Sequence, residues 1–179
     1  MKNTRPQFTH PLIFAIVSLL ITPFGASAAL TDTHLLPKYS THYDIKQDAF
    51  KDGAAAVSLA TSTNRRILIE LGGDWCSWCK KMDAFLDANP DIKQKLHETF
   101  VMLKINVSDE NDNAEFLKPF PKPLGYPHMY VSEYNGSVLW SQDTAEFLKD
   151  GKYTREAFLA FFKRWNIKNN PPKNITKNK

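Results

Sequence analysis

The hydrophobic and polar positions in the first half of the chain change from a helical period to short apolar runs. Residues 44–60 carry apolar positions at helical spacing, so we expect a helix there that is weak or interrupted at Gly53. Residues 66–71 (RILIEL) form an apolar run that contains one acid, and residues 100–107 (FVMLKINV) form another. Apolar runs of this length with β-branched residues predict buried strands.

Helical periodicity returns between these two runs. From Cys76 the apolar positions recur on one helical face until Asn89-Pro90 ends the helix. Asp91 can cap a second short helix that runs through His97. Two strands that are joined through helices are expected to pair in parallel by a crossover connection.

The second half of the chain predicts a hairpin and a final helix. Residues 127–134 (PHMYVSEY) and residues 137–141 indicate strands that are joined by a tight type I′ turn at Asn135-Gly136. Thr154 can cap a last helix that runs through Trp165 and buries a row of aromatic side chains. The predicted fold class is therefore α/β, with a mixed central sheet flanked by helices on both faces.

The two ends of the chain lack this patterning. We expect an irregular N-terminal extension at residues 29–43, the folded domain at residues 44–166 and a flexible tail at residues 167–179.

Residues 1–28 have the pattern of a secretory signal peptide. The chain begins with basic residues, continues with an apolar run at residues 12–21, and reaches the small residues Ala26-Ser27-Ala28. The apolar run has roughly half of the ~20 residues that a membrane-spanning helix needs, and an uncleaved membrane anchor is the alternative. We predict cleavage after Ala28, a periplasmic or secreted protein, and no stable membrane insertion after cleavage.

The composition narrows the possible function classes. Apolar residues make up 42% and charged residues 23% of the chain, which is typical of a globular protein. The formal net charge of +4 is small and scattered, so no nucleic-acid partner is expected. The chain has none of the glycine-rich motifs that bind nicotinamide, flavin or nucleotide phosphates, so we predict no cofactor. A reducing role would then require a membrane electron-transfer partner.

The candidate chemistry lies in the two cysteines, Cys76 and Cys79. Their number excludes a multi-bridge mini-protein and a four-cysteine zinc module. Cys76 follows a predicted strand and opens a predicted helix, where unpaired N–H groups and the helix dipole favour a thiolate and lower a cysteine pKa from ~8.5 to about 3.5–7.5. Cys79 returns one turn later on the same face. We therefore expect a redox disulfide in which Cys76 is the exposed nucleophile and Cys79 the shielded resolving thiol.

Other uses of the pair remain open. A structural disulfide is one, although so short a loop constrains the unfolded chain little. A metal site is another, although a tetrahedral zinc site would need two further ligands besides the cysteines. A metal-handling or chaperone module could hold a soft ion such as Cu(I) with Cys76, Cys79 and His128.

The residues around the cysteines resemble the thioredoxin superfamily. Residues 67–80 (ILIELGGDWCSWCK) and Gly125-Tyr126-Pro127 match that family's hydrophobic strand, its W-C-x-x-C-K motif and its later G-x-P. The similarity is to periplasmic thioredoxin-like proteins with a D-W-C-x-x-C-K core. It implies a thioredoxin-like fold and a thiol-disulfide oxidoreductase that exchanges disulfides with exported proteins carrying thiols or disulfides.

The resemblance also implies roles for two residues outside the cysteine motif. Pro127 matches the family's cis-proline, which faces the two sulfurs, and the peptide at Tyr126 would offer backbone hydrogen bonds to an extended substrate segment. Glu70 stands where many family members carry a buried acid. Buried, it could accept the proton of Cys79; the alternative is a solvent-facing position at a sheet edge.

Three further residues are candidates for substrate contact or tuning of the site. Trp75 is expected to pack beside the cysteines, and Trp78 to offer an apolar contact to a partner. His128 could tune the thiolate, help to bind a metal, or form a hydrogen bond at the surface. The pair Ser77-Trp78 departs from the better-known family members, so the direction of electron flow stays open.

Overall fold

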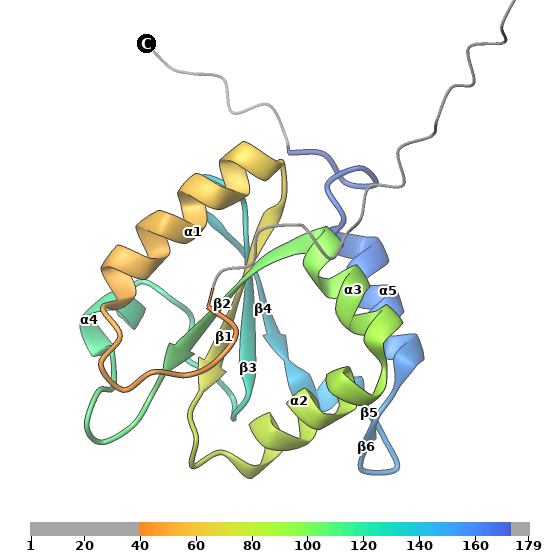
Figure 1. The fold of residues 1–179 in the computed structure, drawn as a ribbon, viewed down its shortest axis with the longest axis horizontal. Coiled ribbons are helices and arrows are strands. Elements are labelled where there is room, and N and C mark those ends of the chain that lie inside the picture. The colour runs from red at the N-terminus through yellow and green to blue at the C-terminus, as the bar shows by residue number, and fades with distance from the viewer. Residues whose placement is uncertain (1–39, 173–179) are drawn as a thin grey trace, which may run out of the picture. The chain divides into compact units, whose positions relative to one another are not determined.

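The computed structural model describes residues 40–172, which form a sheet covered by helices on both faces (Figure 1). The predicted signal peptide, residues 29–39 of the predicted extension and residues 173–179 of the predicted tail lie outside the described residues. In chain order the elements are α1 (Ala49–Thr63), β1 (Arg66–Gly72), α2 (Ser77–Ala88), α3 (Pro90–Thr99), β2 (Phe100–Asn106), α4 (Ala114–Leu117), β3 (His128–Ser132), β4 (Val138–Asp143), the 3-10 helix η2 (Thr144–Phe147), β5 (Leu148–Lys149), β6 (Lys152–Tyr153) and α5 (Arg155–Trp165).

The central sheet is mixed, as the sequence predicts. Its strand order is β2-β1-β3-β4. Strand β1 pairs in parallel with β2, which places Glu70 opposite Lys104. Strand β3 pairs antiparallel with both β1 and β4. The parallel pair is joined through α2 and α3, and this connection carries the cysteine motif at its start.

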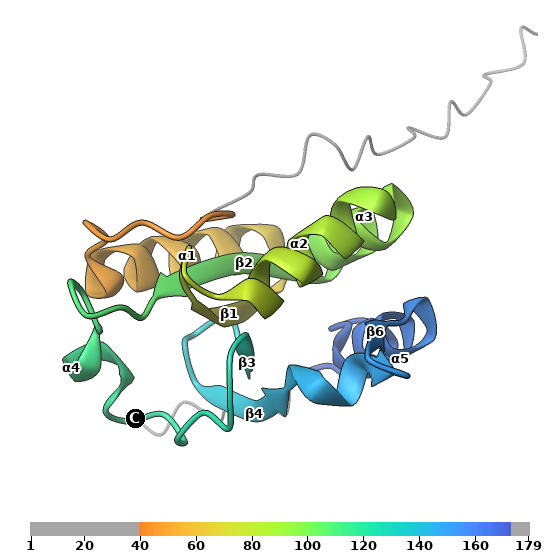
Figure 2. The same cartoon turned by 90° about the horizontal axis from the view of Figure 1, so that it is seen from below.

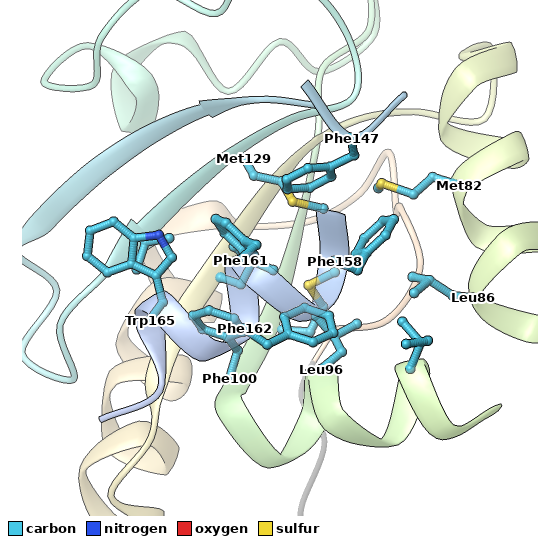
Figure 3. Close-up of a cluster of buried hydrophobic side chains, with 14 residues drawn as sticks. Met82, Leu86, Leu96, Phe100, Met129, Phe147, Phe158, Phe161, Phe162 and Trp165 are labelled. Carbon is cyan, nitrogen blue, oxygen red and sulfur yellow. The ribbon is translucent and has the colours of Figure 1, made fainter. Parts of the chain in front are cut away.

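Alternate side chains of the strands enter two separate cores. One face packs against α2, α3 and α5 in a cluster rich in aromatic residues (Figure 3). The Phe158 ring lies 4.8 Å from the Phe147 ring of this cluster and 5.2 Å from the ring of the partly buried Phe85. The other face packs against α1 and α4, which lie away from α5 across the strands (Figure 2). Each buried face therefore holds its own set of helices.

Helix α1 differs from its predicted limits at both ends. It begins after Asp48, whose carboxylate accepts hydrogen bonds from the backbone N–H groups of Phe50 and Lys51, both at 3.1 Å. The expected break at Gly53 is wrong, because the helix runs through this position. A Cβ at Gly53 would lie 3.1 Å from the Phe116 ring, so the glycine allows close packing that outweighs its low helix propensity.

Two local predictions from the sequence are also wrong. Asp91 does not cap α3; Pro90 is the first residue of that helix, and the Asp91 carboxylate instead pairs with Arg155 at 2.6 Å. The β3–β4 turn is not of type I′, because Gly136 has a φ of +90° while Asn135 does not have a positive φ. The backbone N–H of Gly136 donates to the carbonyl of Glu133, so Gly136 is the fourth residue of the turn. The positive φ therefore lies just after the two central residues, Tyr134 and Asn135.

The final helix agrees with its prediction. Thr154 caps α5 by accepting the N–H of Ala157. Its buried side chains are aromatic: Phe158, Phe161, Phe162 and Trp165.

Residues 40–48, the described segment before α1, form no helix or strand, but this segment is bound to the outer edge of β2. The backbone N–H of Lys104 donates to the carbonyl of Ser40 at 3.3 Å. The Gln47 side chain donates to the Lys104 carbonyl at 2.8 Å and accepts the N–H of Asn106 at 3.1 Å. This segment therefore belongs structurally to the sheet, which the sequence pattern did not indicate.

Within residues 40–172, no helix combines the length and the apolar character that crossing a membrane requires.

Candidate active site

Cys76 and Cys79 form a disulfide at the first turn of α2. Their Cα atoms are 5.2 Å apart and their sulfurs 2.11 Å apart. Cys76 is the N-cap of the helix, and its sulfur accepts the backbone N–H of Cys79 at 3.1 Å. The positive end of the helix dipole and this N–H favour negative charge on the Cys76 sulfur after reduction. The predicted placement at a helix start is thus confirmed.

The predicted exposure of Cys76 is wrong. The residue is 3% exposed and Cys79 is 1% exposed, so both sulfurs are sheltered in the disulfide form. The reason lies in the cap geometry, because a sulfur that accepts the Cys79 N–H turns over the first turn of its own helix instead of toward solvent.

Glu70 is fully buried on β1, two residues before Gly72 on the same face of the strand. Its Oε1 accepts the Tyr43 hydroxyl at 2.5 Å and lies 3.3 Å from the Lys104 ammonium, while Oε2 has no hydrogen-bond partner. Burial raises the pKa of Glu70, and the opposing Lys104 charge does not cancel that effect. The sheet-edge alternative is therefore excluded, and Glu70 is a buried acid.

Lys104 connects this buried acid to the surface. Its ammonium contacts both oxygens of Asp83, at 2.6 and 2.8 Å, and the Asp83 side chain is 44% exposed. Burial alone would lower the pKa of Lys104, but the Glu70 and Asp83 carboxylates hold it above its ordinary value. Asp83 and Lys104 also border a hollow of about 190 Å³. The polar contacts that run from Glu70 through Lys104 therefore reach solvent at Asp83.

Gly72 brings this buried cluster next to the disulfide. A Cβ at Gly72 would stand 2.5 Å from the Cys79 sulfur and 2.5 Å from the Tyr43 hydroxyl oxygen. No side chain fits there, so glycine allows the sulfur and the hydroxyl to approach the same point. The sequence pattern did not indicate Tyr43, because this partly buried residue lies in the irregular lead-in, where no periodicity marks the positions that face the sheet.

The loop before β3 contacts Trp75, the residue that precedes Cys76. The Tyr126–Pro127 peptide bond is cis, as the resemblance implies, and Pro127 is buried. Trp75 is 56% exposed; its indole N–H donates to the Val107 carbonyl at 2.7 Å, and its ring meets the Tyr126 ring edge-on at 5.4 Å. The Trp75 side chain therefore packs on Val107 and Tyr126.

An apolar hollow follows along this rim. It measures about 270 Å³, and its lining includes Trp78, Tyr126, Pro127 and Tyr153. The half-buried Trp78 ring meets the Tyr153 ring edge-on at 6.1 Å and carries the Lys81 ammonium 3.9 Å above its centre. An extended apolar segment would fit such a surface.

His128 does not join the site. It is 1% exposed, one of its ring nitrogens shares a hydrogen bond with the Ser141 hydroxyl at 2.8 Å, and its ring packs on Tyr130. It is paired with Leu71, on the opposite face of the sheet from Glu70. Direct substrate contact is therefore not supported. The candidate Cu(I) site of Cys76, Cys79 and His128 therefore lacks its third ligand. Residues 40–172 contain no cluster of three side chains suited to metal binding.

The Thioredoxin-like family model matches residues 48–132, a stretch that contains β1, the cysteine motif and all of β3. Among solved structures, a disulphide isomerase from Xylella fastidiosa Temecula1 superposes with a TM-score of 0.58 at 23% identity. The superposition covers 68% of this chain and 94% of that one. The chain therefore has a thioredoxin-like fold, and residues 48–132 are similar to the Thioredoxin-like family.

The chain is also similar to DsbD proteins. The oxidised C-terminal domain of Neisseria meningitidis DsbD has a TM-score of 0.52 at 18% identity, covering 72% of this chain and 99% of that one. The thiol:disulfide interchange protein DsbD of Citrobacter koseri is 30% identical over 113 residues, 63% of this chain and 18% of the relative. That of Klebsiella pneumoniae is 24% identical over 170 residues, 90% of this chain and 26% of the relative. The chain thus spans about a quarter or less of the Citrobacter koseri and Klebsiella pneumoniae DsbD proteins.

Proposed function

We propose that the protein is an exported thiol-disulfide oxidoreductase that exchanges disulfides with partner proteins through Cys76 and Cys79. The observation that carries this proposal is the disulfide at the opening turn of α2, with the Cys76 sulfur on a helix N–H. The DsbD relatives, which are thiol:disulfide interchange proteins, support the same reaction class.

In the reducing direction, the Cys76 thiolate attacks one sulfur of the partner's disulfide and forms a mixed disulfide, while the partner's S–S bond breaks and its other sulfur leaves as a thiolate. Cys79 then loses its proton and attacks the Cys76 sulfur, which releases the partner as a thiolate and leaves the Cys76–Cys79 disulfide. Two electrons pass to the partner in each cycle. Glu70 is the proton acceptor for Cys79 in this scheme, because burial raises its pKa toward that of a thiol.

The partner surface is the rim around the disulfide. Trp75, Trp78 and Tyr126 supply aromatic surface, and the 81% exposed Leu124 extends it. The peptide at Tyr126, before Pro127, would pair with an extended segment of the partner. The signal-peptide pattern of residues 1–28 supports partners among exported proteins in the periplasm or outside the cell, and reductive turnover there would draw electrons from a membrane partner.

Reduction of insulin by dithiothreitol tests the proposed function. The wild-type protein should accelerate insulin precipitation, and Cys76→Ser should leave only the uncatalysed rate, because the attacking sulfur is gone. Ser77→Ala is the matched control, since it changes a neighbouring exposed side chain and keeps both thiols. Equal rates for wild type and Cys76→Ser would show that the protein does not catalyse insulin reduction through Cys76.

Glu70→Gln should slow the release step by about 10²-fold, the lower end of what a positioned general base contributes. In the wild type, the release rate should rise as pH rises through the raised pKa of Glu70, because only the carboxylate accepts a proton. In Glu70→Gln the side-chain amide accepts no proton, so the release rate should not show this rise with pH. Stopped-flow kinetics across pH measures both effects. Glu115→Gln, at an exposed ion pair with Lys118, is the control; a Glu70→Gln profile that matches this control would exclude the role.

A further inference from the structure

We propose that Tyr43 carries the proton between Cys79 and Glu70 during the release step. This inference rests on the proposed function, and it assigns to the segment before α1 a part in the chemistry of the site.

The position of the Tyr43 hydroxyl is the first argument. The hydroxyl donates to Glu70 Oε1 at 2.5 Å, and the point above Gly72 that a Cβ would occupy is 2.5 Å from both this oxygen and the Cys79 sulfur. The hydroxyl therefore lies close to both the thiol that must lose a proton and the carboxylate that can take it. A hydroxyl can accept one proton while it donates another.

The ring of Tyr43 is held in place from two sides. The Lys104 ammonium lies 4.7 Å from the ring centre. The segment that carries Tyr43 is bound to β2 by the backbone of Ser40 and the side chain of Gln47. An irregular segment without such anchors would not hold a hydroxyl at a fixed distance from a buried acid.

The charges around Tyr43 keep it in the neutral form that a relay needs. Burial and the nearby Glu70 carboxylate raise the pKa of Tyr43 above its ordinary value. The other titratable groups that face it are Asp83 on α2, Lys104 on β2 and Tyr153 on β6. Tyr43 thus passes a proton without ionising.

The step balances as follows. The Cys79 S–H proton goes to the Tyr43 oxygen while the Tyr43 O–H proton goes to the Glu70 carboxylate. The Cys79 thiolate forms a bond to the Cys76 sulfur, and the bond between Cys76 and the partner sulfur breaks. The electron pair of that bond leaves with the partner, which takes a proton from water.

Tyr43→Phe tests the relay, because it removes the hydroxyl and keeps the ring over Lys104. Under single-turnover conditions with a disulfide peptide, we expect the first-order release step to slow by at least about tenfold. The second-order attack by Cys76 should stay within about twofold of wild type. The pH midpoint of release should move upward, because Glu70 loses a donor that lowers its pKa.

Tyr134→Phe, which removes a hydroxyl near the β3–β4 turn, is the matched control and should behave as wild type. Release in the wild type should also slow in D₂O. The relay would be overturned if Tyr43→Phe kept the wild-type release rate and pH midpoint. It would also be overturned if attack and release slowed equally, because that result would indicate a structural role for Tyr43. Failure of wild type to exceed Cys76→Ser in the insulin assay would instead contradict the proposed function itself.

Discussion

Cys79→Ser protein is expected to accumulate a mixed disulfide through Cys76 when it meets a partner disulfide. The Cys79 sulfur is the group held in bonding distance of the Cys76 sulfur, so its removal leaves release to external thiols. Well-placed intramolecular nucleophiles act at effective molarities far above any added thiol, and multiple turnover with millimolar dithiothreitol should therefore fall by roughly 10³-fold or more.

Non-reducing electrophoresis and mass measurement of the trapped species check this prediction. The adduct should disappear on reduction and should be absent in the Cys76→Ser/Cys79→Ser double variant. Cys76→Ser alone is the decisive comparison, because it keeps the Cys79 thiol. Equal trapping by Cys76→Ser would reverse the assigned order of the two sulfurs.

Arg66→Met should destabilise the fold by about 3–5 kcal/mol, because it leaves the buried Glu133 carboxylate without its counter-charge. The Arg66 side chain is 2% exposed and contacts Glu133 at 2.7 Å. It also donates to the backbone carbonyls of Trp165 and Asn170, at 2.9 and 2.8 Å. One guanidinium thus joins the start of β1 to the end of β3 and to the chain after α5. Urea unfolding should show the loss as a lower midpoint with an unchanged slope.

Two further variants separate the buried charge from the packing of the side chain. Arg66→Met combined with Glu133→Leu should recover much of the lost stability, because no uncompensated charge remains. Arg155→Met removes a cation of the exposed pair with Asp91, and solvent screening should make its effect much smaller. A midpoint for Arg66→Met that equals that of Arg155→Met would contradict the importance of the buried pair.

The main elements of the site could be predicted from the sequence because each leaves a local signal. The run before Cys76 has the length of a strand and the residues after it have helical spacing, which together place the sulfur at a helix start. Glu70 was identified as an acid inside an apolar run, and the structure buries it completely. The resemblance added the cis bond before Pro127, for which spacing alone gives no signal.

The remaining features depend on contacts between distant segments. Tyr43 reaches Glu70 across 27 positions of sequence, and nothing in the pattern around Tyr43 marks it as partly buried. The helix continues through Gly53 because the Phe116 ring packs on it, a contact that propensity does not contain. The burial of Cys76 follows from the direction of its sulfur at the cap, since periodicity assigns a face to a residue but not a rotamer.

The anchoring of residues 40–47 on β2 makes the two edges of the sheet unequal. Outward-facing backbone groups of Lys104 and Asn106 are already engaged by Ser40 and Gln47, whereas β4 is the last strand on the other side. Three of its side chains, Val138, Leu139 and Trp140, are more than a third exposed. Open edge strands are templates for further strand pairing. Self-association by strand addition would thus extend the sheet from β4 and leave the edge nearest Tyr43 untouched.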